Sequence, residues 1–175
     1  DPEHYTSAAD LVTMAEAALE RPYLSRLART RLVSFTPSPN GVARRAQTTN
    51  RLLGVYPGVV GLKTGYTGPA GFCVTASAIQ KGQRLISVVM GCSTDKARAT
   101  ETTRLLTYGF NMYKQVPVIA AAGEALDDPV SVKGGKKKMV TVAYGESLTV
   151  SVPRDREEDI VIQNEIAEPV PAPLE

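Results

Sequence analysis

Two nearly continuous apolar runs separated by a short turn constrain the fold of this chain more than any other feature. Residues 71–79 and 84–91 are apolar at nearly every position, and Gln80-Lys81-Gly82-Gln83 joins them. A strand with one solvated face alternates apolar and polar residues, whereas a strand buried on both faces reads as a continuous apolar run. The pattern therefore predicts two adjacent strands in a sheet that is covered on both faces.

Helical patterns lie on either side of this strand pair. Residues 6–20 repeat apolar side chains at helical spacing, and Ser7 followed by Asp10 resembles a capping box. Pro22 favours the start of a short second helix, and residues 94–114 form a long third one. Candidate caps for the third helix are Ser93, Thr94 and Asp95.

Other segments are typical of strands. Residues 31–37 and 42–49 flank a turn that contains Asn40-Gly41, a strong hairpin signal. Residues 58–67 form a further extended segment.

The character of the chain changes after Gln115. Residues 1–115 carry 14 basic and 7 acidic side chains, whereas residues 116–175 carry 6 basic and 11 acidic ones and, in a much shorter stretch, half of the twelve prolines. We therefore expect two domains, 1–117 and 118–175, with the boundary in the transition at 115–125.

The second domain is expected to be rich in β-structure. Strand-like runs at 139–143 and 147–152 surround the turn at Tyr144-Gly145-Glu146. The tail, residues 167–175, alternates proline with apolar residues and is therefore predicted to be extended or loose rather than helical.

Composition excludes several kinds of site. A net charge of +2 gives no general argument for nucleic-acid binding, and the single histidine, His4, cannot build a histidine-rich metal site. We expect no metal and no cofactor, and any hydrolytic chemistry must use a base other than histidine. With the turn centred near Lys81-Gly82, Cys73 falls opposite residue 90 rather than Cys92, so we expect two buried thiols and no disulfide.

The triplet Lys63-Thr64-Gly65 at the end of an apolar strand is the most informative polar segment. On an edge strand, the lysine supplies a positive charge, the threonine a hydroxyl, and the glycine room for another backbone. An extended peptide added as a further strand would then meet the lysine and the hydroxyl with its terminal carboxylate. A strand running into a turn, with Lys63 solvated, is the alternative reading of the triplet alone.

The surroundings of the triplet resemble a known enzyme family. The segments that agree, in order and at similar spacing, are His4–Asp10, Asn50–Leu53, Val60–Thr67, Ala70–Phe72, Arg84–Gly91 and Leu105–Phe110. Together they resemble the serine D-alanyl-D-alanine carboxypeptidases, the low-molecular-mass penicillin-binding proteins, over about residues 1–155. The resemblance implies an α+β fold. A transpeptidase, β-lactamase-like domain with an antiparallel sheet and flanking helices would be followed by a small β-rich domain.

Family members combine three motifs, Ser-x-x-Lys, Ser-x-Asn and Lys-Thr-Gly. The first two precede the helix at 6–20 in the family, and these 175 residues hold neither at the expected place. Ser93-Thr94-Asp95-Lys96 matches the first pattern but follows Lys-Thr-Gly, so it is interpreted as a helix cap. Ser38-Pro39-Asn40 matches the second but lies only 23 residues before Lys63, so it is interpreted as a turn.

The resemblance assigns substrate-binding roles and no catalytic nucleophile. Lys63 would set the electrostatics beside the serine, Thr64 would bond the substrate carboxylate, and Gly65 would permit close backbone approach. The backbone N–H of Tyr66 would be one of two oxyanion-hole donors. Arg98 would support carboxylate binding, with a solvated helical arginine as the equal alternative.

We therefore expect a C-terminal part of a carboxypeptidase that trims terminal D-alanine from peptidoglycan stem peptides through a serine acyl-enzyme. The expected partners are a stem peptide ending in D-Ala-D-Ala, β-lactams in the intact enzyme, and a separate N-terminal fragment if the enzyme is split. A non-catalytic peptide-binding module is the other alternative. The resemblance implies an extracytoplasmic location, with membrane contact only through an anchor that these residues do not contain.

The chain alone is expected to be inactive, because the covalent step has no nucleophile. After incubation of the pure 175-residue chain with labelled penicillin, mass spectrometry should detect no covalent adduct on the chain. A penicilloyl adduct mapped to one of its serines would contradict this expectation.

Overall fold

A three-stranded antiparallel sheet is the centre of the first of two compact units, residues 1–112. The computed structural model describes residues 3, 5–38, 40–166 and 169–172. The strand order is β3 (Val59–Thr67), β4 (Gly71–Gln80) and β5 (Gln83–Cys92). The two apolar runs are thus neighbouring strands, as predicted, and β3 lies at one edge of the sheet.

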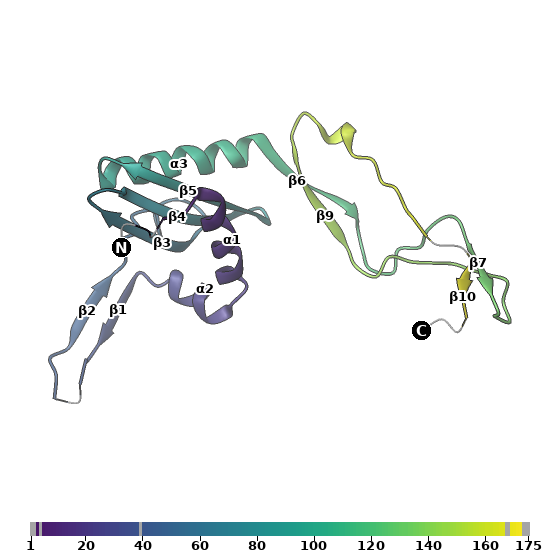
Figure 1. Ribbon diagram of the computed structural model, residues 1–175, viewed down its shortest axis with the longest axis horizontal. Helices are drawn as coiled ribbons and strands as arrows, with labels where there is room; N and C mark the ends of the chain where they lie inside the picture. Colours follow the sequence, from purple (N-terminus) through teal and green to yellow (C-terminus); the bar gives the residue numbers. More distant parts are fainter. Residues whose placement is uncertain (1–2, 4, 39, 167–168, 173–175) are drawn as a thin grey trace. The chain divides into compact units, whose positions relative to one another are not determined.

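The central strand β4 is covered on both faces, as its apolar run predicted. Its five consecutive residues from Val74 to Ala78 are all buried. Helix α3 (Asp95–Met112) packs against β4 and β5 on one face, and α1 (Ala8–Leu19) lies on the other (Figure 1). An added Cβ at Gly109 of α3 would lie 2.6 Å from Leu85 Cδ1, so the glycine lets helix and sheet approach closely.

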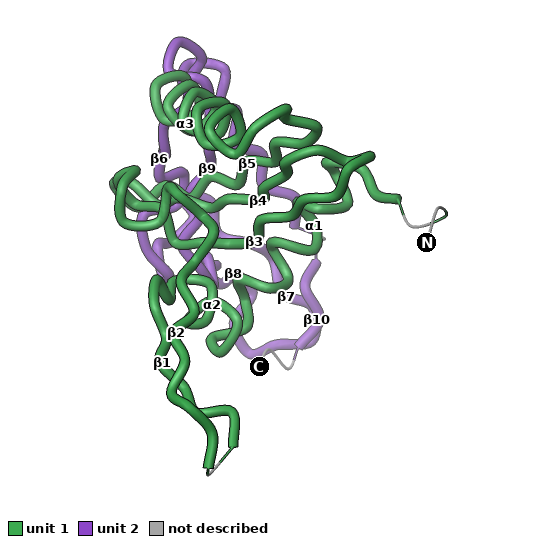
Figure 2. Tube along the Cα trace, turned by 90° about the vertical axis from the view of Figure 1, so that its left-hand side faces the viewer, with its two compact units in different colours: residues 1–112 green, residues 113–175 purple. Residues whose placement is uncertain are grey.

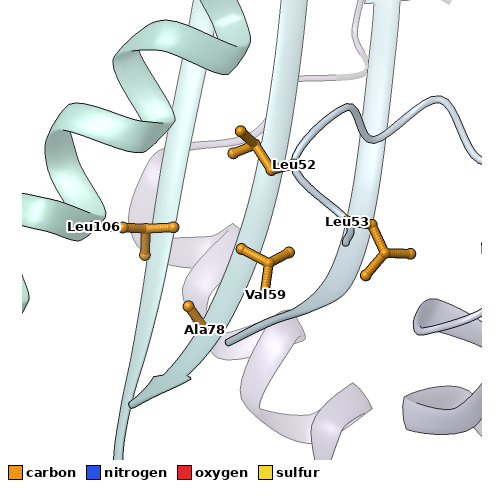
Figure 3. Close-up of a cluster of buried hydrophobic side chains, with 5 residues drawn as sticks. All are labelled: Leu52, Leu53, Val59, Ala78 and Leu106. Carbon is orange, nitrogen blue, oxygen red and sulfur yellow. The ribbon is translucent and has the colours of Figure 1, made fainter. Parts of the chain in front are cut away.

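A cluster of buried aliphatic side chains joins α3 to the sheet and to the loop before β3 (Figure 3). Its members are Leu52, Leu53, Val59, Ala78 and Leu106. Two of the five members, Leu52 and Leu53, come from the loop. The segment that leads into β3 is therefore held in place by hydrophobic burial.

Helix α1 begins with the predicted capping box. The Ser7 hydroxyl accepts from Asp10 N at 3.2 Å, and the Asp10 carboxylate accepts from Ser7 N at 3.0 Å. Donation by the Ser7 backbone N–H, and then by its hydroxyl, holds the pKa of Asp10 below its ordinary value. The short helix α2 (Pro22–Ala28) starts at the predicted proline and packs against β3.

A two-stranded hairpin extends from the first unit away from the central sheet (Figures 1 and 2). It consists of β1 (Leu32–Phe35) and β2 (Arg44–Gln47), and all eight strand residues are exposed. At its turn, Gly41 N donates to Ser38 O at 2.9 Å. The turn interpretation of the Ser38–Asn40 segment is therefore confirmed, although Pro39 itself lies outside the described residues.

The second unit, residues 113–175, is built from short strands (Figure 2). Strand β6 (Tyr113–Ile119) pairs with β9 (Leu148–Pro153), and β7 (Val130–Lys133) pairs with β8 (Met139–Val140) and with β10 (Val170–Pro171). A single 3₁₀ turn, Glu157–Asp159, follows β9. Of the proline-rich tail, Val170–Pro171 forms β10, and residues 167–168 and 173–175 lie outside the described part.

One detail of the second unit differs from expectation. The runs at 139–143 and 147–152 contain β8 and β9, which belong to separate sheets and do not pair with each other. The end of the first run instead contacts an earlier segment, where Leu126 N donates to Val142 O and an isolated bridge joins Ala125 to Ala143. The two units separate directly after α3, between Met112 and Tyr113. In the part of the chain that the structure describes, no helix has the length and apolarity needed to cross a bilayer.

Replacing Leu106 with alanine should destabilise the first unit. Leu106 is a member of the buried cluster and is 1% exposed, and Leu→Ala at such sites costs about 2–5 kcal/mol. Urea unfolding followed by circular dichroism would measure the change. The neighbouring Leu105→Ala is the matched control, because Leu105 is 48% exposed and should cost less than about 1 kcal/mol. Equal losses in the two variants would contradict this account of the core.

Candidate functional site

The Lys63-Thr64-Gly65 triplet lies on edge strand β3, with one side of the strand paired to β4. The three residues stand opposite Thr75, Val74 and Cys73 of that strand. No sheet neighbour occupies the other side of β3 among the described residues. An added Cβ at Gly65 would meet nothing within 4 Å, so the strand leaves room beside this residue for a second backbone.

A groove of about 800 Å³ runs beside this edge. One wall is β3 and the start of β4, and the opposite wall is the segment after β2 together with the start of α3. The lining residues are Gln47, Thr48, Thr49, Arg51, Lys63, Thr64, Gly65, Tyr66, Phe72, Asp95 and Arg98. All five residues assigned to substrate binding by resemblance therefore face one concavity.

Hydroxyl groups link the two walls of the groove. The side chains of Thr49 and Thr64 are 2.5 Å apart at their Oγ1 atoms and share a hydrogen bond. A hydroxyl has one proton and two acceptor sites, so Thr64 can accept from Thr49 and still donate to a ligand. The exposed Lys63 ammonium donates to the backbone oxygen of Thr64 and stays at the rim of the groove.

The guanidinium of Arg98 lies beneath the triplet and is buried, with 7% of its side chain exposed. Its Nη1 donates to Cys73 O at 3.2 Å and, more weakly, to Gly65 O at 3.4 Å, while Nη2 donates to Thr49 O at 3.2 Å. One side chain thus fastens β3, β4 and the segment before β3 to α3. The alternative of a solvated helical arginine is wrong, because the strands cover this turn of the helix.

A single carboxylate balances two of the groove's cations. Asp95 accepts from Arg98 Nη2 on Oδ1 and from Arg51 Nε on Oδ2. Lys63 is the third cation of the lining, so the groove carries three positive charges and one negative charge. This balance attracts an anionic ligand.

Aromatic packing supports the wall at Tyr66 and Phe72. The two rings lie with centroids 4.3 Å apart, and their residues are directly opposite each other in the β3–β4 register. Arg98 Cζ lies 5.7 Å from the centroid of Phe72. These contacts keep the Tyr66 backbone in extended geometry beside the groove, although the Tyr66 side chain is 61% exposed.

A hollow in the second unit has the opposite electrostatic character. It measures about 460 Å³, and its lining includes Glu124, Asp127 and Asp128 but no basic side chain from the part of the chain that the structure describes. A carboxylate would be repelled there. The groove beside β3 is therefore the candidate site for the free end of a peptide.

The family assignment follows from comparison with known proteins. The family model described as D-alanyl-D-alanine carboxypeptidase matches residues 1–94, which include β3, β4 and the whole Lys-Thr-Gly triplet. The chain belongs to the D-alanyl-D-alanine carboxypeptidase family. The resemblance inferred from the sequence is thereby confirmed.

Individual relatives of this carboxypeptidase family match over much of the chain. D-alanyl-D-alanine carboxypeptidase DacF of Bacillus subtilis is 32% identical over 95% of the chain and 43% of its own length. DacC of Escherichia coli is 37% identical over 74% of the chain and 32% of its own length. The chain thus spans less than half the length of these relatives.

Solved structures of the family agree on the fold. Penicillin-binding protein 5 from Haemophilus influenzae superposes with a TM-score of 0.75 at 29% identity, over 99% of the chain and 49% of that protein. A mutant of the Streptomyces K15 DD-transpeptidase gives a TM-score of 0.61 at 25% identity, over 64% of the chain and 45% of that protein. The predicted α+β fold with antiparallel sheet and flanking helices is confirmed.

The sequence lookalike of the family's Ser-x-x-Lys motif is a helix cap, as interpreted. The Thr94 hydroxyl accepts from Ala97 N at 3.0 Å at the start of α3. Ser93 and Lys96 are both exposed, and neither lines the groove. His4, the one histidine, lies outside the described residues.

The cysteine prediction was right about bonding and wrong about burial. Both thiols are free, but each is partly exposed. Counted back from the turn, the simple register holds as far as Val74, which lies opposite Val89. A register shift between Val74 and Phe72 then places Cys92 opposite Phe72. The irregularity lies at the open end of the strand pair, where the sheet is less covered.

Several groove residues were not assigned from sequence. Thr49, Arg51 and Asp95 line the groove, but they come from a loop and from a helix start that had been interpreted as a capping segment. The Asn50–Leu53 segment carried part of the family resemblance, which was the one available signal for this wall. Nothing in the local pattern indicated that Asp95 would pair with two arginines.

Replacing Arg98 with alanine should cost roughly 3 kcal/mol in unfolding free energy, because three backbone oxygens and a carboxylate lose a buried donor. Urea unfolding of the chain would measure it. Arg104→Ala on the same helix is the matched control, since Arg104 pairs only with Glu101 among described contacts and is 74% exposed. That variant should change stability by less than about 1 kcal/mol. Similar values for the two variants would refute the role of Arg98 in holding the strands.

Proposed function

We propose that the whole protein removes the terminal D-alanine from peptidoglycan stem peptides that end in D-Ala-D-Ala. The observation that carries this proposal is the groove beside edge strand β3, in which a hydroxyl and three cations surround an open strand edge. A peptide with a free C-terminus needs both main-chain partners and a positive environment for its carboxylate. Membership of the carboxypeptidase family supports the same substrate class.

In the proposed complex, the peptide lies along β3 as an additional strand. Its terminal carboxylate accepts a hydrogen bond from the Thr64 hydroxyl, whose orientation Thr49 stabilises by donating to it. Arg98 supports this site from below by holding the backbone at Gly65 and Thr49 and by contributing positive charge. Gly65 leaves the space that the substrate backbone occupies.

The reaction we propose is acyl transfer to a serine of the family's Ser-x-x-Lys motif. The serine oxygen bonds to the carbonyl carbon of the penultimate residue, the C–N bond breaks, and D-alanine leaves with a proton. Water then hydrolyses the ester. The Tyr66 backbone N–H would donate to the oxyanion, and Lys63 at the groove rim would add positive charge beside the serine.

The rest of the proposal concerns the organisation of the whole protein. The unit 1–112 would form the C-terminal part of a transpeptidase-like domain, and residues 113–175 would belong to the β-rich second domain. The enzyme would act outside the cytoplasm, in the periplasm or on the cell-wall side of the membrane, because its substrate is cell-wall peptide. β-Lactams would acylate the same serine, and a separately supplied N-terminal fragment would have to restore activity if the enzyme is split.

Replacing Thr64 with valine in the full-length protein should lower kcat/KM for a D-Ala-D-Ala peptide by about ten- to a hundredfold. A hydrogen bond to a charged group contributes about 1.5–3 kcal/mol, and valine keeps the shape while removing the donor. Release of D-alanine would be measured enzymatically. Thr100→Val, at an exposed α3 position outside the groove, is the matched control and should keep the original rate. Full activity of the Thr64→Val protein would refute the proposed carboxylate site.

A further inference from the structure

Among the described residues, Asp95 is the one acidic side chain that lines the groove. It is also the only acidic residue in the whole stretch between Glu20 and Glu101. A lone carboxylate among the cations of an anion-binding groove needs an explanation, because it weakens the attraction that the groove exerts on an anionic ligand.

The contacts of Asp95 join two walls of the groove. Oδ1 accepts from Arg98, three positions along α3, and Oδ2 accepts from Arg51 on the segment before β3. The exposed fraction of the side chain is 26% for Asp95, 65% for Arg51 and 7% for Arg98. The Arg51–Asp95 pair is thus within reach of a ligand, whereas Arg98 is enclosed.

The two arginines differ in how strongly they depend on Asp95. Arg98 also donates to three backbone oxygens, which hold its guanidinium in place without the carboxylate. For Arg51, Asp95 is the one partner among the contacts of the described residues. Removing the carboxylate charge would therefore release Arg51 and leave Arg98 where it is.

We propose that Asp95 is an internal counter-ion that determines how strongly the groove prefers a free carboxylate over an uncharged peptide end. A ligand carboxylate makes the same pairing with a guanidinium that Asp95 makes with Arg51. The ligand must compete for Arg51, so Asp95 sets the strength of carboxylate recognition. The inference rests on the proposed function, since it concerns the ligand class of the same groove.

The test compares two probes on the 175-residue chain, N-acetyl-D-alanyl-D-alanine and its C-terminal amide. Dissociation constants come from NMR titration of arginine Nε–H and backbone signals, at low and at high salt. In Asp95→Asn, the ratio of acid to amide affinity should rise about five- to tenfold at low salt, and salt should reduce the gain. In Arg51→Gln the ratio should fall below that of the unmodified chain.

Glu101→Gln supplies the matched control. Glu101 lies on the same helix and pairs with Arg104 three positions later, as Asp95 pairs with Arg98, but neither residue lines the groove. This variant removes the same charge and should leave the ratio unchanged. Thermal unfolding of each variant separates a loss of fold from a change in recognition.

The inference would be overturned if the ratio of acid to amide affinity stayed the same or fell in Asp95→Asn. Failure of this variant to bind the acid at all would also overturn it. Equal shifts in Asp95→Asn and Glu101→Gln would also overturn it, because net charge alone would then explain the effect. Failure of the proposed function gives a different result. The unmodified chain would then show no preference for the acid over the amide. Asp95→Asn would still gain such a preference, and this gain would support the counter-ion role of Asp95.

Discussion

The buried guanidinium of Arg98 is the interaction on which the candidate site depends. It reaches from α3 to the backbone of β3, β4 and the segment before β3, three parts of the chain that are distant in sequence. A planar group with five donors suits this task, because it can meet several carbonyl oxygens in fixed directions. The edge of the sheet at Lys-Thr-Gly keeps its geometry because this side chain lies beneath it.

The groove combines an open strand edge with a charge pattern that suits an anionic peptide end. The loop before β3 forms one wall of the groove, and burial of its Leu52 and Leu53 side chains holds it in place. A hydrogen bond between Thr49 and Thr64 links that wall to β3. Packing therefore sets the width of the groove, while Arg51, Lys63, Asp95 and Arg98 set its charge. Arg98 serves both purposes, because it holds three backbone segments and also carries charge, whereas Arg51, Lys63 and Asp95 contribute mainly charge.

Local patterns predicted the elements well where local physics decides them. The capping box at Ser7, the proline at the start of α2 and the continuous apolar run of β4 all appear in the structure as expected. Predictions were weaker where partners are chosen at long range. The runs around residue 144 begin strands of different sheets, and a register shift near Cys73 changes which residue faces Cys92.

By itself the sequence determined the order of helices and strands in the first unit, the family resemblance and the position of Lys63, Thr64 and Gly65 on a strand, because these depend on periodicity, capping and contiguous motifs. Tertiary structure alone decided that Thr49 would bond to Thr64, that Arg98 would be buried beneath the triplet, and that Asp95 would bridge two arginines. Most of these contacts join segments between 15 and 49 residues apart. The pairing of Asp95 with Arg98 is local, but the burial of Arg98 depends on those longer contacts. No local pattern encodes them, because burial and pairing at long range are settled only when the helices pack onto the sheet.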